Sequence, residues 1–156
     1  MHSERRGESR CAWRADGERG ASTVEFATLG VLLLVPIVYL VVTVGRVQAA
    51  SLAAQAGARS AARVMTSADT TEQGRARAAQ AADLAVTDQG FDTEDGRLDL
   101  VCSERACLTP GARVTATVQV SVVLPGVPGF VDGLIPLRVQ VRASQVAAVD
   151  TFRAPG

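Results

Sequence analysis

The hydrophobic pattern is dominated by an apolar run near the N-terminus. Phe26 to Gly45 contains no formally charged side chain, and its only titratable group is the phenol of Tyr39. A helix of about 20 residues rises roughly 30 Å, which matches the hydrocarbon thickness of a bilayer. We therefore expect a transmembrane helix over residues 21–45, with Pro36 inside it, because membrane helices tolerate proline better than soluble ones do.

Two other interpretations of the apolar run stay open. One is a buried core helix of a soluble domain, although such helices seldom need an uninterrupted apolar perimeter of this length. The other is a cleaved secretory signal, because Val47-Gln48-Ala49 and Ala54-Gln55-Ala56 are small-residue patterns that signal peptidase accepts. The run is longer than the roughly 7–15 apolar residues of a signal peptide, which favours the spanning helix.

Beyond the apolar run, strong helix formers without proline predict that the helix continues to about Met65. Small residues recur at a spacing of four along this part of the helix. They form two rows, Ala49, Ala53, Gly57 and Ala61, and Ala50, Ala54, Ala58 and Ala62. Such rows permit close backbone approach, to a sheet or to copies of the same helix. An alanine-rich helix of high propensity without that role would show the same rows.

A second helical stretch, Glu72–Thr87, precedes a change of the pattern to period two. Strand patterns occupy residues 98–102, 113–125 and 136–150, and a loop rich in Gly and Pro separates the last two. The residues expected to face inward are Val114, Ala116, Val118, Val120 and Val122 in the middle strand and Leu137, Val139, Val141 and Ala143 in the last. The predicted fold class is α+β, with a long N-terminal transmembrane helix that continues into a soluble helix and packs on a small antiparallel sheet.

These elements divide the chain into five regions. They are a cytoplasmic leader (1–20), the transmembrane helix (21–45), an extracytoplasmic helical region (46–97), an antiparallel strand region (98–150) and a C-terminal tail (151–156). The leader is polar and short, so we expect it to have no fold of its own.

The distribution of charge predicts the orientation of the chain in the membrane, but it indicates no charged partner. The chain has 16 basic and 16 acidic residues, and every basic residue is Arg. No basic tract is present, so we expect no nucleic-acid partner. Arginines are more frequent before the apolar run than soon after it: Arg5, Arg6, Arg10, Arg14 and Arg19 against Arg46, Arg59 and Arg63. This bias favours a single-pass protein of the cell membrane with a cytoplasmic N-terminus and an extracytoplasmic C-terminal domain.

The cysteines agree with that location. Cys102 and Cys107 bracket a turn-sized spacing beyond the membrane segment, where oxidation is permitted. We expect them to form a disulfide hairpin, which would stabilise the fold by roughly 2 kcal/mol. Two cysteines without histidine cannot complete a zinc shell, so we expect no metal site. Cys11, in the leader, should stay reduced.

The sequence lacks the residues that common catalytic sites need. His2 is the only histidine, and no phosphate-binding glycine loop, HExxH motif or EF-hand loop is present. Asp92, Glu94 and Asp95 lie in a polar loop before a strand, where solvated turn residues explain them better than acid–base catalysis does. We therefore expect no catalytic residue, no cofactor and no enzyme, but a structural or assembly role.

The stretch "RGASTVEFATLGVLLLVPIVYLVVTVGR" resembles the N-terminus of TadE-like proteins, which are minor pilins or pseudopilins of the tight-adherence (Flp-type) branch of type IV pilus assembly. The matching features are Arg19-Gly20, four small or apolar residues, Glu25-Phe26 and a proline-containing apolar helix. The Cys pair, "VVLPG" and "VAAVDTFR" are similar to actinobacterial members. The resemblance implies a pilin-like fold. It also implies that a membrane-embedded prepilin peptidase cuts after Gly20, which leaves Ala21 as the N-terminus and Glu25 as its fifth residue.

The residues of this motif suit such processing. Gly20 adopts extended backbone at low cost, so it can enter a protease cleft before the helix begins. Ser22 or Thr23 would cap the helix, and Glu25 would lie in its first turn, near the positive end of the dipole. After the cut, the Glu25 carboxylate could pair with the free amine of Ala21 in a neighbouring subunit and fix the register of packed helices. The alternative makes Glu25 only a helix-start residue.

The expected function is a minor pilin or pseudopilin in assembly of a tight-adherence, type IV-like pilus. The resemblance implies a prepilin peptidase, other pilin-like subunits and the pilus assembly machinery as partners, and the apolar run adds the lipid bilayer. Gly20 and Ala21 are the expected processing site, and Glu25 and Phe26 the expected assembly residues. The alternative is a signal-anchored extracytoplasmic binding or envelope protein that enters no filament.

Overall fold

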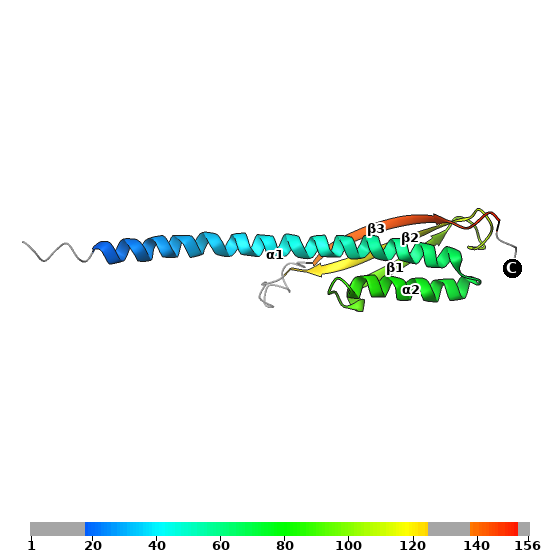
Figure 1. Cartoon of the computed structure of the whole chain (residues 1–156), viewed down its shortest axis with the longest axis horizontal. Helices are drawn as coiled ribbons and strands as arrows, with labels where there is room; N and C mark the ends of the chain where they lie inside the picture. The colour runs from blue at the N-terminus through cyan, green and yellow to red at the C-terminus, as the bar shows by residue number, and fades with distance from the viewer. Residues whose placement is uncertain (1–17, 125–137, 153–156) are drawn as a thin grey trace, which may run out of the picture. The chain divides into compact units, whose positions relative to one another are not determined.

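The computed structural model describes the backbone of residues 18–124 and 138–152, and the side chains from Val24 onward. Two α-helices, a short 3-10 helix and three strands follow one another along the chain (Figure 1). They are α1 (Glu18–Ser67), α2 (Thr71–Thr87), η1 (Thr93–Asp95), β1 (Gly96–Cys102), β2 (Arg113–Val123) and β3 (Arg138–Ala148). The predicted α+β fold class is confirmed, since the chain combines a long apolar helix with a small antiparallel sheet.

The chain divides into two compact units, residues 1–40 and 41–156. In the first unit, the described part of α1 is apolar and exposed, and the helix runs through Pro36 without a break. The most apolar part of α1 has no residue buried against the rest of the described chain. The alternative of a buried core helix is therefore wrong, because a core helix would be mostly covered. By length and composition, this one helix is able to span a bilayer.

The second unit contains a three-stranded sheet in the order β1-β2-β3, with both strand pairs antiparallel. In the registers of the sheet, Cys102 lies opposite Val114, and Val118 lies opposite Ala143. The central strand β2 alternates between buried and half-buried residues along its length, as its sequence period predicts. The buried side chains of β2 are Val114, Ala116, Val118, Val120 and Val122.

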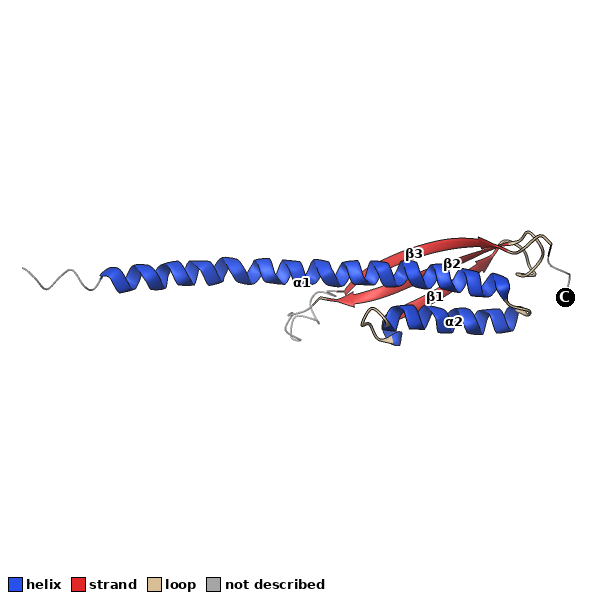
Figure 2. Ribbon diagram, viewed as in Figure 1, coloured by secondary structure: helices blue, strands red, loops and turns tan. Residues whose placement is uncertain are grey.

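The two helices cover the buried face of this sheet (Figure 2). Both small-residue rows of α1 contribute to the core, which also includes Met65 of the same helix. From α2 the buried residues recur at a spacing of four: Gly74, Ala78, Ala82 and Val86. The two small-residue rows of α1 therefore pack against the sheet, which is one of the roles that the sequence allows for them. Small side chains are needed there because helix backbones lie close to the strands and to each other.

The inward face of β3 is only partly covered. Val141 and Ala143 are half-buried and pack against the core, as expected. Val139 lies opposite the buried Val122, on the same inward face, but is 37% exposed. Leu137, also expected to face inward, lies outside the described residues. The inward face of β3 is only partly covered because β3 pairs with a single strand and lies at the edge of the sheet.

The turn between the helices is closed by a side-chain cap. Thr70 precedes α2 in an extended conformation, and its hydroxyl oxygen accepts a hydrogen bond from the backbone N–H of Gln73 at 3.3 Å. Thr70 therefore caps the first turn of α2. The predicted start of α2 at Glu72 is one residue late.

Candidate functional site

The predicted processing and assembly residues all lie in the N-terminal part of α1. The helix begins at Glu18, so Gly20 and Ala21 are helical rather than part of an extended segment before the helix. The expectation that Ser22 or Thr23 caps the helix is therefore wrong, and Glu25 lies one turn deeper than expected. The physical reason is local: no proline interrupts residues 18–25, and a single glycine costs a helix only about 1 kcal/mol.

This helical start changes what processing requires. For Gly20 to enter a protease cleft in extended form, the first turn of α1 must unwind. Glycine eases that step, because it loses more conformational freedom in a helix than any other residue and favours the helix least after proline. Gly20 is then the weak point of the first turn.

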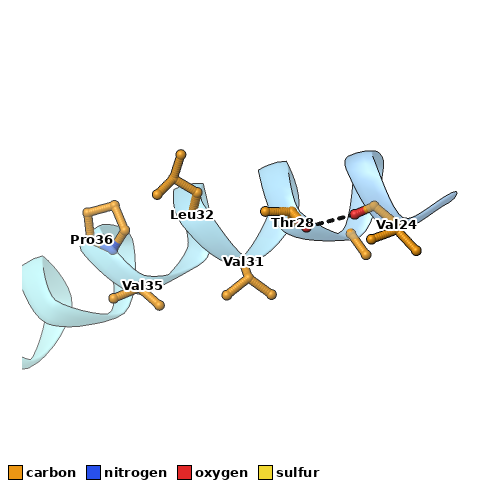
Figure 3. A pocket seen from close by; sticks show the side chains of 7 residues that line it. Val24, Thr28, Val31, Leu32, Val35 and Pro36 are labelled. Atoms are coloured by element: carbon orange, nitrogen blue, oxygen red, sulfur yellow. Dashed lines mark hydrogen bonds between the residues drawn. The ribbon is translucent and has the colours of Figure 1, made fainter. Parts of the chain in front are cut away.

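The predicted assembly residues follow the processing residues on α1, and their side chains are exposed. Glu25 is exposed, and Phe26 is 79% exposed. The Thr28 hydroxyl donates a hydrogen bond of 2.8 Å to the Val24 carbonyl oxygen one turn earlier, so this hydroxyl is satisfied within the helix (Figure 3). The carboxylate of Glu25 is consequently the group here that gains most from an outside partner.

An apolar surface follows the same stretch of α1. Its side chains recur at spacings of three and four, which places them along one side of the helix (Figure 3). They are Val24, Ala27, Thr28, Val31, Leu32, Val35 and Pro36. Because Pro36 has no backbone N–H, the carbonyl of Leu32 lacks its intrahelical donor. The surface suits lipid or another apolar helix, and it offers no group for chemistry.

A contact that the sequence did not predict lies where the apolar run ends. Arg46 is the first charged residue after the run, and its guanidinium carbon lies 5.9 Å from the centroid of the Phe91 ring. Phe91 is buried in the turn after α2, so this cation–π contact ties α1 to that turn. The sequence shows an Arg at the end of the apolar run and one aromatic residue in a polar turn. Because the two are far apart in the sequence, no local pattern predicts their contact.

The second predicted feature is the disulfide, and the structure joins Cys102 to Cys107 with a Cα–Cα distance of 5.1 Å. Cys102 ends β1, and Cys107 is buried against the core. The loop is also fastened by Ser103, whose N–H donates to the Arg113 carbonyl and whose hydroxyl accepts from the Arg113 N–H, both at 2.9 Å. The predicted pairing is confirmed, and Cys11 lies outside the described residues.

The acidic loop residues show no arrangement for chemistry. Asp92 and Glu94 are exposed and Asp95 is half-buried, around the short helix η1. Among the residues that the structure describes, no group of three or more His, Cys, Asp or Glu side chains could hold a metal ion. The solvated turn that the sequence predicted agrees with these positions.

Comparison with known proteins identifies the N-terminal segment. Residues 20–63 match the family described as TadE-like protein. The match begins at Gly20 and includes Glu25, the apolar run and both small-residue rows of α1. It does not extend to the sheet or the disulfide. No curated protein and no solved structure matches the chain.

Proposed function

Because the chain is TadE-like over residues 20–63, we propose that it is a minor pilin or pseudopilin of a tight-adherence, type IV-like pilus. A TadE-like segment indicates involvement in the tight-adherence pilus system. The observation that carries the finer proposal is the match itself, which joins Gly20 and Glu25 to an apolar helix that nothing in the described chain covers. The role is structural, not catalytic.

In this proposal a prepilin peptidase cuts after Gly20. The mature helix then begins at Ala21, and Glu25 falls in its first turn, where the positive end of the dipole favours a carboxylate. The carboxylate of one subunit pairs with the free amine of Ala21 in the next and fixes the axial register of the packed helices. In the poorly screened interior of such a bundle, an ion pair is strongly favoured over two separate charges.

The domain beyond the apolar run is proposed to lie outside the cytoplasm. The disulfide supports this location, because such bonds persist in oxidising compartments. The exposed apolar part of α1 supports single-pass anchoring. A secretory cut after Ala56 is disfavoured, since it would remove the buried residues Ala50, Ala53 and Ala54 from the core.

The test is the N-terminus of the mature protein. We expect intact mass and N-terminal sequencing of the membrane-extracted chain to give Ala21 as the first residue. Gly20→Leu should keep the leader, because a bulky side chain obstructs the protease cleft. Gly30→Leu is the matched control: no atom lies within 4 Å of a Cβ at Gly30, so this variant should be cut normally.

Other N-termini would contradict the proposal in different ways. A first residue at position 50, 51 or 57 would indicate secretory cleavage. An uncut chain in cells that process other prepilins would favour the anchored envelope protein that enters no filament.

A further inference from the structure

The outer face of the sheet, which the helices do not cover, carries most of the charge of the strands. The side chains on this face are the exposed and half-buried residues that alternate with the core positions. Its charged members are Arg97, Arg113, Arg138, Arg142 and Asp99. We call the four arginines the arginine face. With four positive charges against one negative charge, this face is basic although the whole chain is neutral.

Hydrogen bonds across the strands hold part of the arginine face in place. Arg97, Gln119 and Arg142 lie side by side in the register of the three strands. The Arg142 guanidinium donates to the Gln119 side-chain oxygen at 2.9 Å, and the Gln119 amide donates to Gln140 at 2.6 Å. A guanidinium has five N–H donors, so Arg142 keeps donors for an incoming carboxylate while its position is fixed.

A complementary surface lies at the end of α2 and in the turn that follows. Residues 78–96 contain five carboxylates and no basic residue. They are Asp83, Asp88, Asp92, Glu94 and Asp95, which we call the acidic stretch. All are exposed except Asp95, which is half-buried.

The stability of α2 does not explain the acidic stretch. Asp83 lies just before the last turn of the helix and Asp88 just after it, and this turn contains no basic residue. A carboxylate at this end faces the negative pole of the helix dipole and weakens the helix. Asp83 and Asp88 are therefore placed against the local stability of α2.

Within one copy, the arginine face and the part of the acidic stretch in α2 lie on opposite sides of the sheet, although Arg97 directly follows the stretch in the sequence. The arginine face points away from the layer that contains α2, because α2 packs on the opposite, buried face of the sheet. Arg142 donates its hydrogen bond to Gln119, a neutral side chain. Both surfaces are thus available to a second copy.

We propose that the arginine face of one copy binds the acidic stretch of a second copy. The two surfaces differ, so the contact is head-to-tail and leaves one free arginine face and one free acidic stretch at the ends, to which further copies add. This contact deepens the proposed pilin role by naming a contact between domains beyond the apolar helix. It requires neither the cut at Gly20 nor the pairing of Glu25.

The test uses charge reversal in trans with full-length copies that carry two different tags. The first variant is Arg97→Glu with Arg138→Glu, which leaves the bonds between Arg142, Gln119 and Gln140 intact. The second is Asp92→Arg with Glu94→Arg; Asp92 makes no side-chain cap bond that the change would remove. Copurification of the two tags from mild detergent at low ionic strength measures association. The control is Arg59→Glu with Arg63→Glu, which reverses two exposed arginines of α1.

We expect two differently tagged copies of the same charge-reversal variant to copurify about tenfold less than two copies of the unmodified chain do. High salt should reduce the copurification of the unmodified chain similarly. The two variants mixed with each other should recover most of the association, because the unmodified arginine face of one meets the unmodified acidic stretch of the other, and the two reversed surfaces also carry opposite charges. The α1 control should associate normally. Equal association of all variants would overturn the proposal, and so would losses that the mixture does not rescue.

The same measurements in a Glu25→Gln background separate this contact from the helix contact. We expect the same fold-changes there, whatever the N-terminus of the mature protein proves to be. A failure of the processing test with intact trans rescue would therefore leave the domain contact standing. Loss of the rescue pattern with normal processing would remove only the domain contact.

Discussion

Gly57 and Gly74 lie inside helices, but their surroundings differ. A Cβ at Gly57 would lie 3.4 Å from a methyl group of Val118, which is an ordinary contact distance. A Cβ at Gly74 would lie 2.8 Å from the Met65 sulfur, 3.0 Å from the Cβ of Ala68 and 3.2 Å from the Met65 carbonyl oxygen. The Met65 side chain can move, but the backbone and Ala68 cannot move easily. Gly74 is therefore required by the close approach of α2 to the end of α1.

Alanine at the two glycines should have opposite effects. Gly74→Ala should lower the free energy of unfolding by about 1–2 kcal/mol, because overpacking outweighs the gain in helix propensity. Gly57→Ala should raise it by up to about 1 kcal/mol, because its Cβ finds room. Thermal and urea unfolding in detergent, followed by circular dichroism, measures both. A stabilising Gly74→Ala would contradict the packing described for this turn.

Glu25 separates membrane insertion from assembly. Glu25→Gln removes the charge with little change in shape, so insertion and the cut after Gly20 should persist. Association with other pilin-like subunits should fall about tenfold or more, since the Ala21 amine of the next subunit loses its ionic partner. The measurement is copurification of the processed variant, with the exposed carboxylate variant Glu104→Gln as control. Undiminished association would leave Glu25 as a helix-start residue only.

At the scale of elements, the loop between β1 and β2 is held by a disulfide, by a turn at Gly111 and by backbone hydrogen bonds. The disulfide closes its first half, and Gly111 closes its second half with φ of 82°, in the left-handed region that favours glycine. The N–H of Val149 donates to the Ala112 carbonyl at 2.8 Å, and the N–H of Gly111 donates to the Val149 carbonyl at 3.2 Å. These bonds fasten the loop to the chain after β3.

The disulfide is expected to contribute measurably to this arrangement. Cys102→Ser with Cys107→Ser should lower the free energy of unfolding by about 2 kcal/mol, the value for closing a loop of this length in the unfolded chain. In the unmodified native protein neither cysteine should react with a thiol reagent until it is reduced. Free labelling of both cysteines would contradict the pairing and the proposed compartment.

At the scale of the whole molecule, α1 carries two different surfaces along one helix. The apolar run lies before Arg46, and the small-residue rows that pack on the sheet lie after it. Ala58 in these rows is fully buried, whereas Ala56 on the same helix is exposed. The close packing of α1 on the sheet thus depends on which side of the helix a residue occupies.

Leucine substitutions test that dependence. Ala58→Leu should lower the free energy of unfolding by about 1–3 kcal/mol, because the close-packed core has no space for the larger side chain. Ala56→Leu should change it by less than about 0.5 kcal/mol, since leucine and alanine are both good helix formers and the site is exposed. Denaturant midpoints of the two variants, compared with that of the unmodified chain, measure the difference. Equal effects would show that α1 does not pack on the sheet through Ala58.

By itself the sequence determined the features that depend on local pattern. The apolar run from Phe26 to Gly45 specifies a helix that can span a bilayer, and strict alternation specifies β2 and its buried face. The short spacing of Cys102 and Cys107 beyond the apolar run predicts a disulfide turn, and the structure joins these two residues. These signals need no knowledge of which other segments lie nearby.

The tertiary structure decided which of those surfaces is covered, and by what. Val139 and Val118 have the same strand pattern, yet only Val118 is buried, because β3 lies at the edge of the sheet. The contact of Arg46 with Phe91 joins residues that are distant in sequence and that no periodicity relates. Burial depends on three-dimensional neighbours, and a one-dimensional pattern specifies the face of an element but not what packs against it.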